Sequence, residues 1–216
     1  MDSCHSAHAM THPHTRPAVG PGTLLSVDLA PQDLGRRLDG VHEPLGDHGS
    51  LRLAAVMALI LPGEVERLVL IERQRSMRSH GGQLAFPGGK PDQTDRDLVD
   101  TALRESEEEV GLDRSTVSVL GRLRPEPTPT GFFIVPFVGR VESGWEPAVT
   151  SEAEVARVLT PTLREVSDPS THRITDVRHW QGRDYELHQF DIADPPLWGA
   201  TARMVWDLLG RMGAAT

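Results

Sequence analysis

Apolar residues gather along this chain in short blocks separated by polar turns, and the blocks predict strands and helices in mixed order. Residues 53–61 and 67–73 are apolar enough for two buried strands, and Pro62-Gly63 between them predicts a turn. A third, short strand is expected over residues 83–86, directly before a pair of glycines. Further strands are expected over residues 117–123, 132–141 and 183–192.

Helical patterns are fewer and stand between these strands. Residues 97–110 predict a helix with Leu98 and Ala102 on its core side, and Asp95 is a candidate N-cap. An amphipathic helix is expected over residues 198–212. Shorter helical segments are expected over residues 33–38, 152–159 and 162–166. Strands and helices in this order predict an α/β fold with a mixed sheet between helices.

The 216 residues suffice for one domain with a short extension. Residues 1–22 are rich in His, Pro, Gly, Ser and Thr and lack periodicity, so we interpret them as a disordered or loosely docked tail. Four histidines of this tail could chelate a transition metal, although exposed histidines more often bind nothing and only keep a segment soluble. Residues 23–216 are predicted to form a single domain.

Charge and cysteine content narrow the classes of function. A net charge of −9 argues against a nucleic-acid partner but not against an anionic small molecule, because a bound cation inverts the local sign. Cys4 is the only cysteine, which excludes an intrachain disulfide and favours a reducing compartment. The strongest apolar run, residues 53–61, is too short to span a bilayer, and no export signal is visible. We therefore expect a cytoplasmic protein without a membrane partner.

A cluster of acidic residues on the predicted helix 97–110 is the main indication of chemistry. Glu105, Glu108 and Glu109 stand at i, i+3 and i+4, so their carboxylates share one face, where like charges destabilise a helix unless a cation collects them. Mg²⁺ or Mn²⁺ suits oxygen ligands and leaves positions open for water and phosphate. Gly88-Gly89 just upstream lets the backbone approach a phosphate closely. A solvated glutamate face is the alternative, but the ordered set favours a metal-dependent phosphate site.

At these residues the sequence resembles the Nudix hydrolases, whose signature is Gx5Ex7REUxEExGU, with U an apolar residue. The second half matches position for position through Arg104, Glu105, Glu108, Glu109, Gly111 and Leu112. The first half departs, because counting back from Arg104 puts Lys90 at the glycine position and Arg96 at the first glutamate position. Ser106 also replaces the apolar residue. The resemblance implies an α/β/α sandwich with a mixed β-sheet and an enzyme that hydrolyses a diphosphate.

The longer spacing after the glycines resembles one subgroup of that family, the coenzyme A diphosphatases. The matching residues are Arg73, Arg78, His80, Gly82, Gln83, Phe86, Pro87, Gly88, Gly89, Asp92, Asp95 and the run from Thr101 to Glu105. Ile71 and Gln74 depart from the subgroup, in which threonine and serine are usual there. This resemblance implies cleavage of coenzyme A (CoA) or acyl-CoA to 4′-phosphopantetheine (or its acyl form) and adenosine 3′,5′-bisphosphate. It is also compatible with a homodimer.

On this resemblance we assign roles to individual residues. The metal ligands for Mg²⁺ or Mn²⁺ are expected to be Glu105, Glu108, Glu109 and the backbone at Gly89. The catalytic set is expected to be Arg104, which orients a glutamate, with Glu105 or the loop residue Glu154 as the base and Glu152 as the alternative to Glu154. The substrate-binding set is expected to be Arg73, Arg78, His80, Gln83 and Gly88. Its basic members suit a 3′-phosphate or the diphosphate.

Two other functions remain open from the sequence. The first is a Nudix hydrolase acting on another nucleoside diphosphate-linked compound, such as ADP-ribose or NADH, or on a nucleoside triphosphate. The second is a ligand-sensing module that keeps the fold without catalysis. Such modules usually lose the metal carboxylates, which this chain retains.

Overall fold

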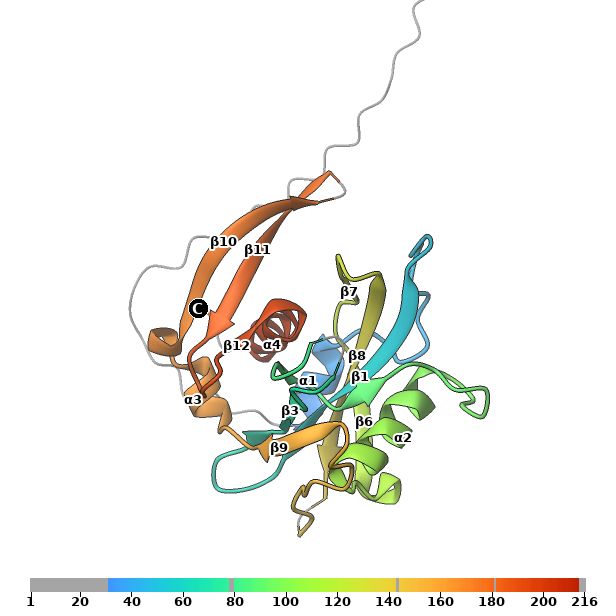
Figure 1. Cartoon of the computed structure of the whole chain (residues 1–216). Helices are drawn as coiled ribbons and strands as arrows, with labels where there is room; N and C mark the ends of the chain where they lie inside the picture. The colour runs from blue at the N-terminus through green and yellow to red at the C-terminus, as the bar shows by residue number, and fades with distance from the viewer. Residues whose placement is uncertain (1–30, 78–79, 143, 181, 214–216) are drawn as a thin grey trace, which may run out of the picture.

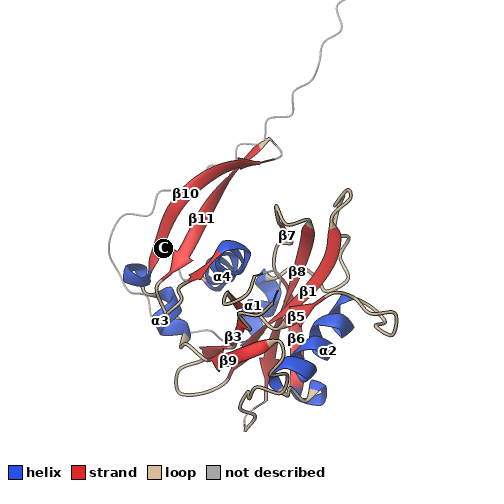
Figure 2. Cartoon of the chain, in the orientation of Figure 1, coloured by secondary structure: helices blue, strands red, loops and turns tan. Residues whose placement is uncertain are grey.

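A mixed β-sheet lies at the centre of the molecule (Figure 1 and Figure 2). The computed structural model of the chain describes residues 31–77, 80–142, 144–180 and 182–213. The main strands of the sheet are β2 (Arg67–Leu68), β1 (Arg52–Leu61), β8 (Phe132–Val141) and β6 (Val117–Arg122), in that order. Strands β1 and β8 run parallel, whereas β2 and β6 run antiparallel to their neighbours. Two short strands complete it, β5 (Gly88–Gly89) on β1 and β7 (Glu126–Pro127) on β8.

Helices cover both faces of this sheet, which explains why β1 is one continuous apolar run instead of an alternating pattern. Ala55 and Met57 of β1 belong to the same apolar cluster as Ala102 of helix α2 (Leu98–Val110). Val56 and Ala58 point the other way, into a cluster with helix α4 (Gly199–Met212). Helix α1 (Pro31–Arg37) lies against α4 on that second face. The expected α/β/α sandwich with a mixed sheet is therefore confirmed (Figure 1).

A second sheet is built from three short strands in the order β4 (Leu84–Ala85), β3 (Leu70–Arg73) and β9 (Val155–Leu159). The single strand expected over residues 67–73 is thus divided between two sheets, at Val69. The helical segment expected over residues 152–159 is wrong. Its C-terminal half forms β9, which pairs with β3, and this distant pairing outweighs the local helical pattern.

The third sheet extends away from the body as a curved arm (Figure 1). It consists of β10 (His172–Trp180), β11 (Arg183–Phe190) and the short β12 (Leu197–Trp198). Strand β10 was not expected from the sequence, because its residues 173–179 are all exposed and show no apolar alternation. Helix α3 (Leu163–Ser167), which precedes the arm, begins with a capping box between Thr162 and Glu165.

Helix α2 is delimited by clear caps. The side chain of Asp97 accepts a hydrogen bond from the Asp100 backbone N–H, so the expectation that Asp95 is the N-cap is wrong. Gly111 ends the helix in the left-handed conformation, at φ 69°. The buried Ser106 hydroxyl donates to the Ala102 carbonyl at 2.7 Å, which satisfies its polar group where the family signature has an apolar residue.

The expected tail, residues 1–22, lies outside the described residues. Within the part of the chain that is described, no helix has both the length and the apolar character needed to cross a membrane.

Candidate active site

The glycine pair Gly88–Gly89 forms the wall of the site as strand β5. Gly88 has φ 152°, and a Cβ there would lie 2.3 Å from the Ala55 carbonyl oxygen. A Cβ on Gly89 would lie 2.4 Å from the Glu105 carboxylate carbon. The contact at Gly88 is with backbone that cannot move aside, so only glycine lets the chain pass β1 there. At Gly89 a side chain would displace the Glu105 carboxylate.

The three signature glutamates of α2 are buried to very different degrees. The exposed fraction of the side chain is 57% for Glu108, 16% for Glu105 and 2% for Glu109. One oxygen of Glu109, Oε2, accepts a hydrogen bond from the Gly88 backbone N–H at 2.9 Å. Its other oxygen, Oε1, is buried without a hydrogen-bond partner, and the nearest cation, Arg73, is 4.0 Å away. Glu109 is therefore a buried carboxylate with only one of its two oxygens hydrogen-bonded.

Burial and mutual repulsion disturb the titration of these groups. Burial raises the pKa of Glu109 to about 8, against the opposing effects of the Gly88 hydrogen bond and of Arg73. Burial also raises the pKa of Glu105, against the opposing effect of Arg104. The charge of Glu154 raises both values further, so this loop carboxylate lies in the same electrostatic field. The site therefore holds more negative charge than its cations neutralise.

Hydrogen bonds from Arg104 connect helix α2 to the segment that follows the glycine turn. Its guanidinium donates to both carboxylate oxygens of Asp95, at 2.9 and 3.1 Å, and to the Lys90 carbonyl at 3.1 Å. It also lies 3.0 Å from a Glu105 oxygen and 3.2 Å from a Glu108 oxygen. The hydrogen bonds from Arg104 hold the pKa of Asp95 well below its usual range. Arg104 thus fixes the direction of Glu105 while its own charge is satisfied by Asp95.

The chemistry of these donors fits a divalent cation. Among the described residues, no three His, Cys, Asp or Glu side chains lie in positions that could hold a metal ion together. The set is nevertheless of the right kind, because it offers hard oxygen atoms, an excess of negative charge and one buried oxygen of Glu109 without a partner. A cation beside Glu105 and Glu109 would supply the missing compensation.

The loop between β3 and β4 carries three of the expected substrate-binding residues, Arg78, His80 and Gln83, and a fourth, Arg73, ends β3. The backbone N–H of Arg73 donates to the Gln83 carbonyl at 3.0 Å, which closes the loop at its base. His80 has φ 59°, and its Nδ1 is 2.8 Å from Oε1 of Gln83. Arg78 lies outside the described residues.

A second loop brings Glu154 towards the site just before β9. Gln74 fastens this loop, since its backbone N–H donates to the Glu154 carbonyl and its side-chain amide donates to the Glu152 carbonyl. The two glutamates are both exposed, but only Glu154 has a charge that affects Glu105 and Glu109. Gln74, which departs from the CoA subgroup, therefore has a structural role.

Comparison with known proteins agrees with this geometry. Residues 51–186 match the family model described as NUDIX domain. The chain is 35% identical over 157 residues to an uncharacterised Nudix hydrolase NudL of Photorhabdus laumondii, covering 73% of this chain and 83% of the relative. It is 36% identical over 154 residues to a NudL of Yersinia pestis, covering 71% and 76%. The chain belongs to the Nudix hydrolases. It is accordingly an enzyme that hydrolyses pyrophosphate bonds.

The solved structures support the same fold for this Nudix hydrolase. A MutT/nudix family protein from Enterococcus faecalis superimposes with a TM-score of 0.50 at 19% identity, covering 79% of this chain and 65% of that one. At this identity the likeness concerns the arrangement of strands and helices alone.

The role of Asp95 was not predicted from the sequence. Counting along the signature placed Arg96 at the first glutamate position, but Arg96 forms a surface ion pair with Asp100. Asp95, one residue earlier, makes the two hydrogen bonds to Arg104. From the sequence, Asp95 was expected to match the coenzyme A diphosphatase subgroup and to cap the helix, but not to be the partner of Arg104.

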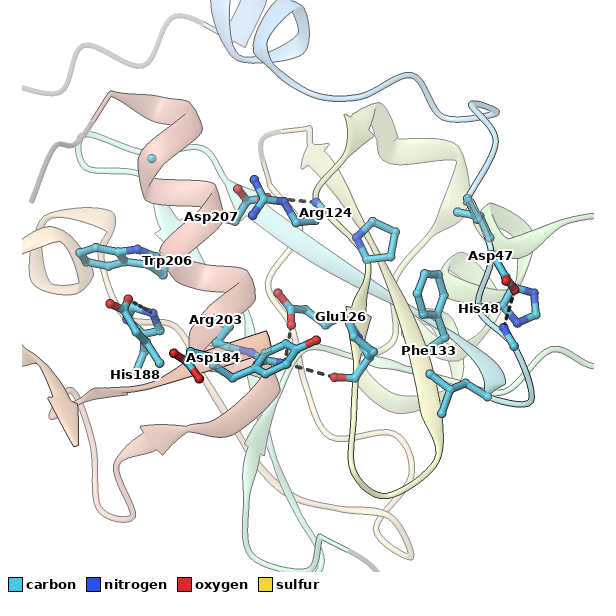
Figure 3. Close-up of a pocket in the computed structure, with 18 of the residues that line it drawn as sticks. Asp47, His48, Arg124, Glu126, Phe133, Asp184, His188, Arg203, Trp206 and Asp207 are labelled. Carbon is cyan, nitrogen blue, oxygen red and sulfur yellow. Dashed lines mark hydrogen bonds and ion pairs between the residues drawn. The ribbon is translucent and has the colours of Figure 1, made fainter. Parts of the chain in front are cut away.

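A large cavity of about 1630 Å³ lies elsewhere, between α4, the arm and β7 (Figure 3). None of the site residues expected from the sequence lines it. Its wall contains a mostly buried ion pair, Arg203 Nη2 to Glu126 Oε2 at 2.5 Å, and the Arg203 guanidinium lies 4.9 Å from the centre of the Tyr185 ring. We therefore look for the chemistry at the carboxylates of α2 and not in this cavity.

Proposed function

We propose that this Nudix hydrolase cleaves the diphosphate of CoA or an acyl-CoA, releasing 4′-phosphopantetheine (or its acyl form) and adenosine 3′,5′-bisphosphate. The partnerless oxygen of Glu109 beside the Gly88–Gly89 turn is the observation that supports a cation-dependent reaction. The CoA assignment is supported by the subgroup pattern from Arg73 to Gly89 and by Asp95, which occupies the shifted acidic position as the partner of Arg104.

In this proposal Glu105 and Glu109 hold Mg²⁺ or Mn²⁺, and the carbonyl at Gly89 completes the ligand set. When bound, such a cation polarises phosphoryl oxygens and acidifies a water molecule. The exposed Glu108 is suited to hold a water at the edge of the site, since more than half of its side chain faces solvent. Glu109, whose pKa is raised to about 8, gives up its proton when a cation takes the place of that proton.

The remaining side chains orient the metal ligands and accept the proton of the attacking water. Arg104 is a positioning residue, because it contacts Glu105 and Glu108 and is itself fixed by Asp95. Glu154 is exposed and within the electrostatic field of the site, so it is our candidate for taking the proton of the attacking water. Glu105 is the alternative base, and Glu152 has less support than Glu154.

Substrate contacts fall on the turn and on the loop before it. Gly88 and Gly89 let a phosphate approach the backbone closely. Arg73, next to Glu109, is placed for the diphosphate itself. The side chains of His80 and Gln83 are within hydrogen-bonding distance of each other in this loop, and we assign them to a polar group of the substrate. A different nucleoside diphosphate-linked compound or a nucleoside triphosphate is the rival substrate.

A product assay separates these substrates. CoA, an acyl-CoA, ADP-ribose, NADH and ATP are incubated with Mg²⁺ or Mn²⁺, and products are identified by chromatography and mass spectrometry. We expect 4′-phosphopantetheine and adenosine 3′,5′-bisphosphate from CoA, only with added cation. Turnover of the unmodified nucleotides alone would refute the CoA assignment.

The carboxylate roles are tested with isosteric variants in the same assay. Glu105→Gln and Glu109→Gln should each lower kcat by at least about 100-fold, the scale for losing a central electrostatic group. Glu107→Gln is the matched control on the same helix, where Glu107 forms a surface ion pair with Arg114, and it should retain its rate. Near-normal turnover of both Glu105→Gln and Glu109→Gln would refute the metal assignment.

A further inference from the structure

Lys90 is the only lysine of the chain, and the other 21 of its 22 basic residues are arginines. It directly follows Gly89, and its carbonyl accepts a hydrogen bond from Arg104. Its backbone is therefore fixed beside the carboxylates. Its exposed side chain turns towards Phe132, with Nζ 5.8 Å from the centre of that ring.

A second cation converges on the same ring. Arg52 opens β1 in register with Phe132, which opens β8, and its guanidinium carbon is 4.2 Å from the ring centre. Within the described part of the chain, neither Arg52 nor Lys90 forms an ion pair with a carboxylate. Both cations thus lie at one ring without a carboxylate partner among the described residues, on a protein with a net charge of −9.

The ring explains how the cations are held but not why they converge. An aromatic face attracts each cation by about 0.5–1 kcal/mol at an exposed site, whereas the two like charges repel each other. A dianion that contacts both side chains would neutralise both charges. A lysine ammonium is a compact charge with three donors and an arginine offers a planar fork, and both suit the oxygens of a phosphate.

The position of this pair relates it to the glycine turn. Gly89 pairs with Ala55 of β1, three residues after Arg52, which corresponds to about 10 Å along the strand. We propose that Lys90 and Arg52, held by Phe132, bind a phosphomonoester dianion that the substrate carries in addition to its diphosphate. This inference rests on the proposed function, in which that group is the 3′-phosphate of CoA. Arg73, beside Glu109, is then left for the diphosphate.

The selectivity for this phosphate is the direct test. kcat/KM is measured for CoA and for 3′-dephospho-CoA with the wild type, Lys90→Gln and Arg52→Gln. We expect the wild type to prefer CoA and each variant to lower that preference by about tenfold. Arg164→Gln is the control, since it removes one exposed positive charge from α3 and should keep the wild-type preference. An equal loss for both substrates, or no loss, would overturn the proposal.

Ligand binding distinguishes failure of this subsite from failure of the proposed function. Calorimetry compares adenosine 3′,5′-bisphosphate with AMP, each with Mg²⁺, on the wild type and Lys90→Gln. A preference for the bisphosphate that disappears in the variant supports the subsite, even if the enzyme hydrolyses another diphosphate instead of CoA. No preference in the wild type would refute the subsite, whatever the reaction.

Discussion

Glu109 shows how one residue of a motif acquires its properties from its surroundings. Helical spacing alone places Glu105, Glu108 and Glu109 on one face as equals. The structure makes them unequal, because the glycine turn covers Glu109 and leaves Glu108 in solvent. The residue types were thus readable from the sequence. Their burial depends on β5 pairing with β1, which the helix pattern does not contain.

The buried carboxyl of Glu109 should make stability depend on pH in a definite direction. Its folded-state pKa of about 8 is above the unfolded value of roughly 4.3, so the folded protein keeps a proton that the unfolded chain releases. Without metal, this group therefore lowers the stability of the wild type as pH rises from about 4.5 through 8. The difference in Tm between Glu109→Gln and the wild type should therefore increase by at least about 3 °C from pH 6 to pH 9.

Thermal unfolding in EDTA at both pH values checks this expectation. Glu107→Gln, which removes an exposed carboxylate of the same helix, should show no such change. A Glu109→Gln gain that is equal at pH 6 and pH 9 would contradict the assigned direction.

At the scale of elements, helix α2 illustrates an ambiguity that sequence reasoning could not resolve. Asp95 and Asp97 both precede the helix, and either could cap it. Asp97 does so, whereas Asp95 is occupied by Arg104, nine residues along the chain. Strand β8 coincides with the segment expected over residues 132–141. Strand β9 was missed because its pairing with β3 outweighs a local helical pattern, and β10 because its residues 173–179 are all exposed.

Substitutions of Asp95 and of Asp97 should have different effects on stability and on kcat. Asp97→Ala removes a cap and should cost about 1 kcal/mol, seen as a Tm lower by roughly 2–4 °C, with kcat retained. Asp95→Asn releases Arg104 and should lower kcat at least about tenfold, because Glu105 loses its fixed direction. Asp95→Glu should recover part of the rate.

Activity and unfolding are measured on all three variants. Equal losses of kcat in Asp97→Ala and Asp95→Asn would show that helix stability, not the position of Arg104, governs the reaction.

At the scale of the whole molecule, the α/β fold was predictable because its central strands are apolar runs and its two long helices carry helical patterns. The resemblance to the Nudix hydrolases implied the α/β/α sandwich. The division into three sheets and the position of the arm were not. They depend on contacts between distant segments, such as Arg203 of α4 with Glu126 of β7 and with Tyr185 of the arm. The same limit hid the Arg52–Phe132–Lys90 group. The parallel register of β1 and β8 brings Arg52 to Phe132, and the pairing of β5 with β1 brings Lys90 there.

The buried pair of Arg203 and Glu126 should stabilise the junction between α4 and the sheet. Burial raises the pKa of Glu126 to about 7, against the opposing effect of Arg203. Without Arg203 that pKa would rise further, so at pH 8 the carboxyl would have to stay buried without its partner or take up a proton, and both cost stability. Arg203→Met should therefore cost about 3 kcal/mol, or roughly 6–12 °C in Tm. Adding Glu126→Leu should recover most of the loss, as chemical denaturation can show. A double variant no more stable than the single one would contradict this reasoning.

The presence of one lysine only, next to the glycine turn, also has a practical consequence. A sample isotopically labelled on lysine alone should give a single backbone amide signal in a correlation spectrum, and it would come from the residue at the edge of the carboxylates. Titrating Mg²⁺ and then a nucleotide against that signal would follow two binding events separately, without any engineered probe.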